Sequence, residues 1–219
     1  MTLFTRERGK LDAVAKGVRR TRSHLAGRLE LATECELLMH RGRSLDVIVS
    51  AAIVHAPWLA VVQPERYAVF SLVAETIDAF CEPDLGMPDV YDLLAGVIAA
   101  IAASSAPSSL LPRFSLRLLE LLGLAPPLDR CVACGKTLSA EAIWLDAQAG
   151  GFVHAACRPR WRDLPELDAA DLENLRRLAS AKGSKMAAVQ ATQAAAKAVE
   201  ELVAHHLGRR PKAGAYLGA

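Results

Sequence analysis

The chain lacks the features of secreted and membrane proteins. Its first residues, Met1 to Arg6, contain no apolar stretch of the kind found in signal peptides. The uncharged run from Leu93 to Pro112 is interrupted by serines and Pro107, so its apolar part is about a dozen residues and too short for a bilayer. The five cysteines are an odd number, which argues against a disulfide framework. We therefore expect a cytoplasmic protein.

The common catalytic motifs are missing as well. The sequence has no phosphate-binding glycine loop ending in lysine, no zinc-protease helix motif and no serine-hydrolase elbow. The zinc deaminase signature fails because the histidine follows the Cys-x-x-Cys pair, and Arg130 stands where that signature has proline. We expect no enzymatic activity.

Charge is unevenly distributed, although the net charge is only +2. The first 28 residues contain eight lysines and arginines against two acidic residues, so the rest of the chain is net negative. This asymmetry indicates a polyanion-binding module at the N-terminal end. The alternative is an ordinary solvated run of charges. The candidate contact residues are Arg6, Arg8, Lys10, Lys16, Arg19, Arg20 and Arg22.

Two closely spaced ligand pairs predict a metal site. Cys131 and Cys134 form one pair, and His154 and Cys157 form the other. Each pair can bend two side chains onto one ion, and the spacing is typical of a zinc ribbon. Four protein ligands leave no open position for a catalytic water, so the zinc is expected to be structural. The alternative is a reduced Cys-x-x-Cys beside an unrelated cysteine and histidine.

Hydrophobic periodicity predicts strands first and helices afterwards. Strands are expected at 2–5 and 10–16 around a turn ending in Gly9, at 29–39, and from Leu45 to Ile53, with Leu45, Val47, Val49, Ala51 and Ile53 facing inward. Helices are expected from Pro64, over 90–101 and 113–122, from Asp168, and from Ser184 to about Gly208. This order is typical of an α+β protein with a small N-terminal barrel or open sheet.

Several stretches, taken in order, resemble the bacterial RecO family of recombination and repair mediators. They are Thr5–Leu11, Gln63–Tyr67, Phe114–Gly123 leading into Cys131–Cys134, and His206–Lys212. The resemblance implies an N-terminal OB-fold barrel and a helical body with an inserted zinc-ribbon-like knuckle. It departs from the family at His154, where a cysteine is usual. Family members also begin with an OB strand that this chain lacks before Met1, so four of five barrel strands are expected.

The resemblance divides the chain into four segments. They are an OB-fold nucleic-acid-binding domain at 1–57, a helical domain at 58–128, a zinc-binding element at 129–162, and helices at 163–219 that complete the helical domain. An OB-fold binds nucleic acid through phosphates and through bases stacked on aromatic rings. Within 1–57 the only aromatic residue besides histidine is Phe4, so we expect mainly electrostatic binding. About six neutralised phosphates would weaken binding roughly a thousandfold between 50 and 200 mM salt.

The function that the resemblance implies is mediation of DNA repair and homologous recombination in the RecF pathway. Such a protein binds single- and double-stranded DNA, anneals complementary strands, helps to load recombinase onto SSB-coated DNA and is nucleoid-associated. Implied partners are RecR and the acidic tail of the single-stranded DNA-binding protein SSB. Tail binding needs an apolar pocket beside cations, for which the candidates are Arg113, Phe114 and Arg117.

Two alternatives from other classes remain open at this point. One is an RNA-binding or ribosome-associated protein that combines an OB-fold with a zinc ribbon. The other is a zinc-dependent hydrolase in which one of the three cysteines of the motif does not bind the metal.

Overall fold

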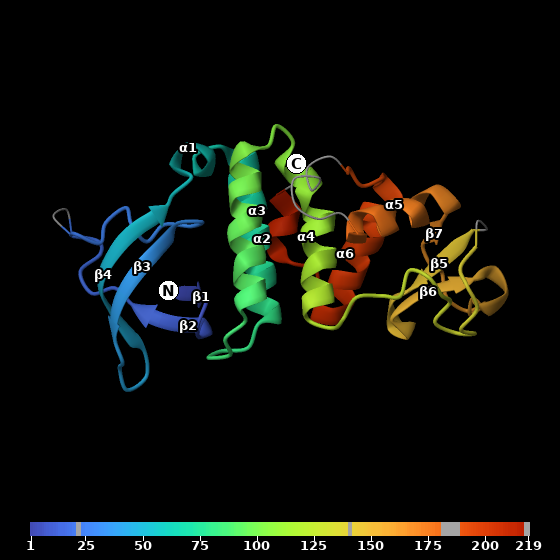
Figure 1. Cartoon of the computed structure of the whole chain (residues 1–219), viewed down its shortest axis with the longest axis horizontal. Helices are drawn as coiled ribbons and strands as arrows, with labels where there is room; N and C mark the ends of the chain where they lie inside the picture. The colour runs from blue at the N-terminus through green and yellow to red at the C-terminus, as the bar shows by residue number, and fades with distance from the viewer. Residues whose placement is uncertain (21–22, 140–141, 181–188, 217–219) are drawn as a thin grey trace. The chain divides into compact units, whose positions relative to one another are not determined.

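The computed structural model describes residues 1–20, 23–139, 142–180 and 189–216 (Figure 1). The chain divides into two compact units, one formed by Met1–Ser108 with Pro211–Ala219 and the other by Ser109–Arg210. The predicted α+β class is confirmed. The division differs from the four predicted segments because the helices between residues 58 and 103 group with the N-terminal strands.

The first unit begins with a four-stranded sheet of order β1-β2-β4-β3. Its strands are β1 (Thr2–Thr5), β2 (Gly9–Val14), β3 (Glu34–His40) and β4 (Asp46–His55). The β1–β2 and β3–β4 pairs are antiparallel, whereas β2 and β4 run parallel over a short register. The N-terminal strands are therefore confirmed, and the closed OB barrel stays a prediction.

The strand predicted at 29–39 begins later than expected. Ala32 has φ of 62°, a left-handed conformation that interrupts extended backbone, and β3 starts at Glu34. From there the prediction holds, because Cys35, Leu37 and Met39 pack against the core of the sheet.

Of the five residues predicted to face inward along β4, only Ala51 is buried. Ile48 and Ala51 are buried, whereas Leu45 and Ile53 are exposed. The register moves from Leu38 opposite Ser50 to Met39 opposite Ile48, so one extra residue enters β4. Such a β-bulge reverses which alternate residues face the core, and simple alternation in the sequence does not reveal it.

The described helices of the first unit are α1 (Trp58–Val61), α2 (Pro64–Phe80), α3 (Pro88–Ala103) and the short 3₁₀ segment η5 (Lys212–Tyr216). The 3₁₀ segment η1 (Pro107–Leu110) spans the boundary to the second unit. Helix α2 begins at Pro64 as predicted and buries Phe70, Val73 and Ile77. Segment η5 returns to α2, where the Glu75 carboxylate accepts hydrogen bonds from the backbone N–H groups of Lys212 and Ala213, both at 2.9 Å.

In its described residues, the second unit combines the helices α4, α5 and α6 with a small sheet of order β6-β5-β7. Its elements are α4 (Leu111–Leu121), β5 (Ile143–Asp146), η2 (Ala147–Ala149), β6 (Gly151–His154), η3 (Ala155–Cys157), β7 (Glu166–Leu167), α5 (Ala169–Ser180) and α6 (Gln193–Leu207). The start predicted for the last helix, Ser184, lies outside the described residues. The described helix begins at Gln193, where the Thr192 side chain accepts a hydrogen bond from the Ala195 backbone N–H.

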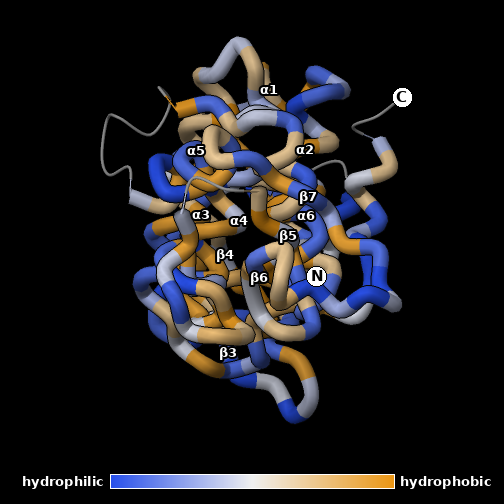
Figure 2. The backbone as a smooth tube through the Cα atoms, turned by 90° about the vertical axis from the view of Figure 1, so that its right-hand side faces the viewer, coloured by the Kyte–Doolittle hydropathy of each residue, from blue (hydrophilic) through white to orange (hydrophobic). Residues whose placement is uncertain are grey.

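Figure 2 shows hydrophobic and hydrophilic segments interspersed along the backbone. Among the described helices, none has both the length and the apolar character that crossing a membrane requires.

Candidate metal centre and basic surface

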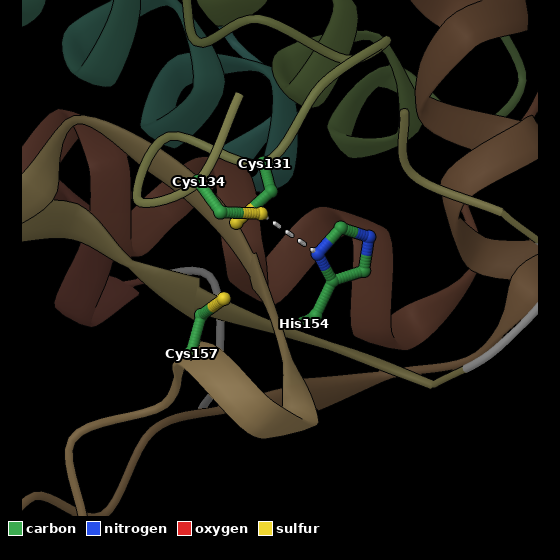
Figure 3. A group of neighbouring side chains, drawn as sticks. All are labelled: Cys131, Cys134, His154 and Cys157. Carbon is green, nitrogen blue, oxygen red and sulfur yellow. Dashed lines mark hydrogen bonds between the residues drawn. The ribbon is translucent and has the colours of Figure 1, made fainter. Parts of the chain in front are cut away.

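The four predicted metal ligands come together in the second unit. Cys131 and Cys134 lie in the loop before β5, His154 ends β6 and Cys157 lies in η3. Their ligand atoms all lie within 4.8 Å of one another. Figure 3 shows the four side chains gathered around one point. The set therefore fits a single metal ion with four protein ligands. This arrangement disfavours both the unrelated-residue alternative and a site that omits one cysteine.

Backbone hydrogen bonds shape the loop that carries the first two cysteines. The Gly135 N–H donates to the Cys131 carbonyl at 2.9 Å, and the Cys131 N–H donates to the Lys136 carbonyl at 2.8 Å. Gly135 has φ of 72°, which permits this tight turn. The Val132 N–H donates to the Phe152 carbonyl at 3.0 Å, so the loop is fixed to the strand that carries His154.

The histidine ring is oriented from both sides. Its Nδ1 atom lies 3.5 Å from the Cys134 sulfur, and its Nε2 lies 3.1 Å from the Thr137 carbonyl. When Nε2–H donates to this carbonyl, Nδ1 keeps its lone pair for a metal. Sequence reasoning missed Thr137, because a backbone acceptor carries no residue-type signal.

The cysteines are electrostatically unequal. Burial opposes ionisation of Cys131, but hydrogen bonds from the backbone at Cys134, His154 and Ala133 outweigh it and lower the pKa of Cys131 to about 6. A hydrogen bond with Cys134 raises the pKa of Cys157 to about 11. One thiolate is thus favoured before a cation arrives, and a bound cation would favour ionisation of the others.

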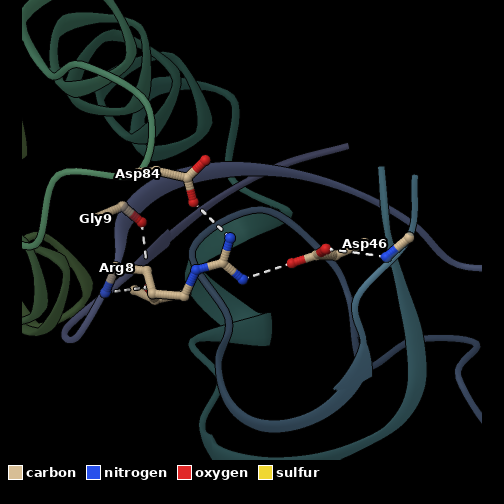
Figure 4. Close-up of polar contacts among 6 residues, drawn as sticks. Arg8, Gly9, Asp46 and Asp84 are labelled. Atoms are coloured by element: carbon tan, nitrogen blue, oxygen red, sulfur yellow. Dashed lines mark hydrogen bonds and ion pairs between the residues drawn. The ribbon is translucent and has the colours of Figure 1, made fainter. Parts of the chain in front are cut away.

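Three of the predicted basic contact residues form ion pairs inside the first unit. Arg6 pairs with Asp92, and Lys10 lies 3.4 Å from Asp78 and donates to its carbonyl at 2.6 Å. Arg8 lies between Asp46 and Asp84 and pairs with both (Figure 4). These side chains join the β1–β2 hairpin to acidic residues elsewhere in the unit. Their charges are already compensated, which weakens the prediction that they contact a polyanion.

Asp46 shows the effect of this pairing on a carboxylate. A hydrogen bond from Arg8 lowers the pKa of Asp46 below its usual range, although burial opposes the shift, and the Gly42 N–H adds a second bond at 3.3 Å. A related contact joins Tyr91 on α3 to Glu34 on β3 at 2.7 Å. Burial, followed by that hydrogen bond, raises the pKa of Tyr91 to about 12.

The remaining basic candidates lie on the connection between β2 and β3. Lys16, Arg19 and Arg20 are exposed, and no acidic partner is found for them among the residues that the structure describes. Arg22 lies outside those residues. The connection is anchored to β4 because Nε2 of His24 donates to the Val49 carbonyl at 3.1 Å and Arg28 donates to the Ala51 carbonyl at 2.8 Å. Its Leu25 side chain is buried in the sheet's core.

The predicted partner-binding residues on α4 differ in exposure. Arg113 is buried and donates to the Leu178 carbonyl at 2.7 Å, and Phe114 is buried with it. Their burial is a structural reason against direct contact with a partner. Arg117 is exposed and pairs with Glu120 at 2.6 Å. The tail-binding prediction is thereby reduced to Arg117.

Comparison with known proteins covers both parts of the chain. The family described as Recombination protein O N terminal matches residues 1–57, and the family described as Recombination protein O C terminal matches residues 62–214. The "DNA repair protein RecO" of Nocardioides sp. strain JS614 is 37% identical over 164 residues, which cover 72% of this chain and 66% of that protein.

A second relative gives the same result. The "DNA repair protein RecO" of Bifidobacterium longum strain DJO10A is 38% identical over 156 residues, which cover 70% of this chain and 64% of that protein. The chain thus spans just under two thirds of the length of these curated relatives. Because the two family matches together extend over nearly the whole sequence, the chain belongs to the RecO family.

Proposed function

We propose that this protein is a non-enzymatic mediator of DNA repair and homologous recombination. It binds single- and double-stranded DNA, anneals complementary strands and helps to load recombinase onto SSB-coated DNA. Family membership supports the process, and one structural observation supports the binding step. Lys16, Arg19 and Arg20 are exposed, and no described acidic residue pairs with them, on a connection that His24 and Arg28 fix to β4.

The ion pairs change the expected strength of binding. With Arg6, Arg8 and Lys10 engaged by aspartates, three described cations remain for phosphates instead of six. Affinity for duplex DNA falls with salt by a slope of about 0.9 per neutralised phosphate on logarithmic axes. Three contacts therefore predict a loss of about 40-fold between 50 and 200 mM salt, well below the thousandfold expected from the sequence.

Annealing of complementary oligonucleotides coated with SSB tests this proposal. The double variant Arg19→Glu, Arg20→Glu should lose most of its affinity for duplex and single-stranded DNA and should anneal slowly. The matched control is Arg41→Glu, Arg43→Glu, which makes the same charge change on two exposed arginines of the β3–β4 turn. An equal loss in both variants would mean that net charge, and not this connection, governs binding. Tighter binding to structured RNA than to single-stranded DNA would favour the RNA-binding alternative.

We also propose that the metal is zinc and that its role is structural. Three thiolates and one imidazole are a soft donor set that suits tetrahedral Zn²⁺, and four protein ligands leave no position for a reacting water. The ion would join the loop before β5 to the end of β6 and to η3. Zinc released on modification of the thiols, measured with a colorimetric chelator, should reach one ion per chain. A purified protein without stoichiometric metal would contradict the assignment.

For partners, we propose the SSB tail and RecR, with Arg117 as a contact for the tail's terminal carboxylate. The guanidinium of Arg117 is exposed on α4 and pairs with Glu120 of the same helix, so the tail carboxylate would replace that contact with the two parallel hydrogen bonds that an arginine can donate to a carboxylate. Titration of a labelled tail peptide should show weaker binding to Arg117→Glu than to Arg177→Glu, which reverses another exposed arginine in the same unit. Equal affinities for the two variants would reject this docking position.

A further inference from the structure

A tight turn in the second unit presents an exposed tryptophan. It follows Cys157 and runs from Pro159 to Arg162, where the Arg162 N–H donates to the Pro159 carbonyl at 3.3 Å. Trp161 stands at the third position of this turn with 85% of its surface exposed. A tryptophan that served packing would be buried, because its ring contributes to stability mainly by leaving water. This one contributes little to the fold.

The turn is held on both sides. Before it, the Arg158 guanidinium lies 5.2 Å from the centroid of the Trp144 ring on β5. After it, Arg162 donates to both oxygens of the buried Asp146 carboxylate, at 3.0 and 3.2 Å. Cys157, one of the four clustered side chains, precedes Arg158 directly. Fixed flanks reduce the entropy that a ligand must remove when it binds the tip.

The tip combines an aromatic face with positive charge. Arg160 is exposed beside Trp161, and no ion-pair partner is found for it within the described part of the chain. The five residues from Arg158 to Arg162 contain three arginines and no acidic residue. Unpaired bases stack on such aromatic faces, while neighbouring cations contact the phosphates.

We propose that Trp161 stacks on an unpaired base of single-stranded nucleic acid and that Arg160 contacts an adjoining phosphate. This contact lies in the Ser109–Arg210 unit and does not depend on the basic connection after β2. It would supply base stacking, for which residues 1–57 offer only Phe4 besides histidines. A protein partner is less suited to this tip, because tryptophan hot spots in protein interfaces lie in well-packed pockets, and the sequence neighbours of Trp161 are arginines.

Fluorescence of the full-length protein provides the direct test. In a Trp58→Phe, Trp144→Phe variant, Trp161 is the only tryptophan, since the chain has three. Oligo(dT) should quench its emission in a saturable way, whereas a blunt duplex should leave it nearly unchanged because paired bases are already stacked. Quenching of equal size by both probes, or by neither, would overturn the proposal.

Affinity measurements complete the test. Trp161→Ala should weaken oligo(dT) binding about 5- to 150-fold, corresponding to the loss of one stacked base. Trp161→Phe should retain most of the affinity, and duplex binding should change less than twofold in both variants. Trp58→Ala, which removes another exposed tryptophan, serves as the control and should bind as the parent does.

The outcomes separate this inference from the proposed DNA-binding connection. If Trp161→Ala binds oligo(dT) like the parent, the stacking proposal is wrong, regardless of the affinity that the Arg19→Glu, Arg20→Glu variant shows. If it loses duplex and single-stranded binding equally, the residue acts through structure or charge and stacking is again rejected. Capture of an acidic peptide by Trp161, with oligo(dT) binding unchanged, would assign the tip to a protein partner and overturn the proposal as well.

Discussion

The two small sheets of this protein are stabilised by different chemistry. The N-terminal sheet has a core that includes small side chains such as Ala13 and Ala51, and Arg6, Arg8 and Lys10 join it to aspartates elsewhere in its unit. The β5–β6–β7 sheet instead buries larger apolar side chains such as Phe152, with Asp146 as a buried charged residue paired to Arg162, and has a cluster of four potential metal ligands at its margin. Short sheets bury too little apolar surface to be stable alone, and here two solutions occur in one chain.

The difference has practical consequences. Arginine–aspartate pairs weaken in acid and in salt, whereas thiolate–metal bonds are lost on chelation or oxidation. We therefore expect each sheet to fail under conditions that leave the other intact, and four experiments probe this expectation.

Removal of the metal should have the largest effect. Cys131→Ser deletes the buried ligand of the cluster, and binding of structural zinc provides on the order of 10 kcal/mol in small zinc domains. Amide hydrogen exchange should become fast throughout β5 and β6 and stay slow in β3 and β4. Cys35→Ser is the control, since Cys35 lies outside the cluster. Unchanged protection of β5 and β6 would show that the apolar interior alone suffices.

Truncation of one phenylalanine in each sheet compares the two cores. Phe152 in β6 is fully buried, so Phe152→Ala should lower the free energy of unfolding by about 3–5 kcal/mol. Phe4 in β1 is only partly buried, and Phe4→Ala should cost about 1 kcal/mol. Urea unfolding followed by circular dichroism measures both. Similar losses would remove the proposed contrast between the cores.

A pair of glycines separates crowding from backbone strain. Gly9 has φ of 66°, and an added Cβ would lie 1.8 Å from the Leu85 carbonyl oxygen, so Gly9→Ala should cost about 2–3 kcal/mol. Gly135 has φ of 72° with open space around it, so Gly135→Ala should cost only about 1 kcal/mol. Thermal unfolding of the two metal-loaded variants measures which substitution lowers the stability more. The reverse order would show that the hairpin turn adapts more easily than the metal loop.

The smallest effect is expected from acid. Because the folded-state pKa of Asp46 lies below its unfolded value, its contribution to stability is present above about pH 4 and is lost as pH falls through the folded pKa. Asp46→Asn should therefore be less stable than the parent at pH 7, and the two should converge in acid. Melting curves between pH 3 and 7 test this. A constant difference over that range would mean that the carboxylate charge is unimportant.

Some of this structure could be predicted from the sequence because its signals are local. The two ligand pairs were recognised from their spacing, and the fold places Cys131, Cys134, His154 and Cys157 side by side. The start of α2 at Pro64 was also predicted correctly. The bulge in β4 was not predictable, because its extra residue depends on the partner strand.

Pairs distant in the sequence were equally hidden. Arg8 was interpreted as a contact for a polyanion, but it pairs with Asp84, which lies 76 residues away. A charged residue in a sequence does not reveal whether an opposite charge from a distant segment will lie next to it in the folded protein. The exposure of Trp161 is of the same kind, since only the folded turn distinguishes it from the partly buried Trp144.

The hydrogen bonds from η5 to Glu75 have a consequence for limited proteolysis. Because residues after Pro211 belong with the N-terminal unit, the polypeptide passes twice between the two units, once after Ser108 and once after Arg210. A single cut after Ser108 would leave the two fragments joined by the hydrogen bonds between η5 and α2. A single cut after Arg210 would leave the two units joined by the intact chain after Ser108. Only a double cut would release the metal-binding half as an independent piece.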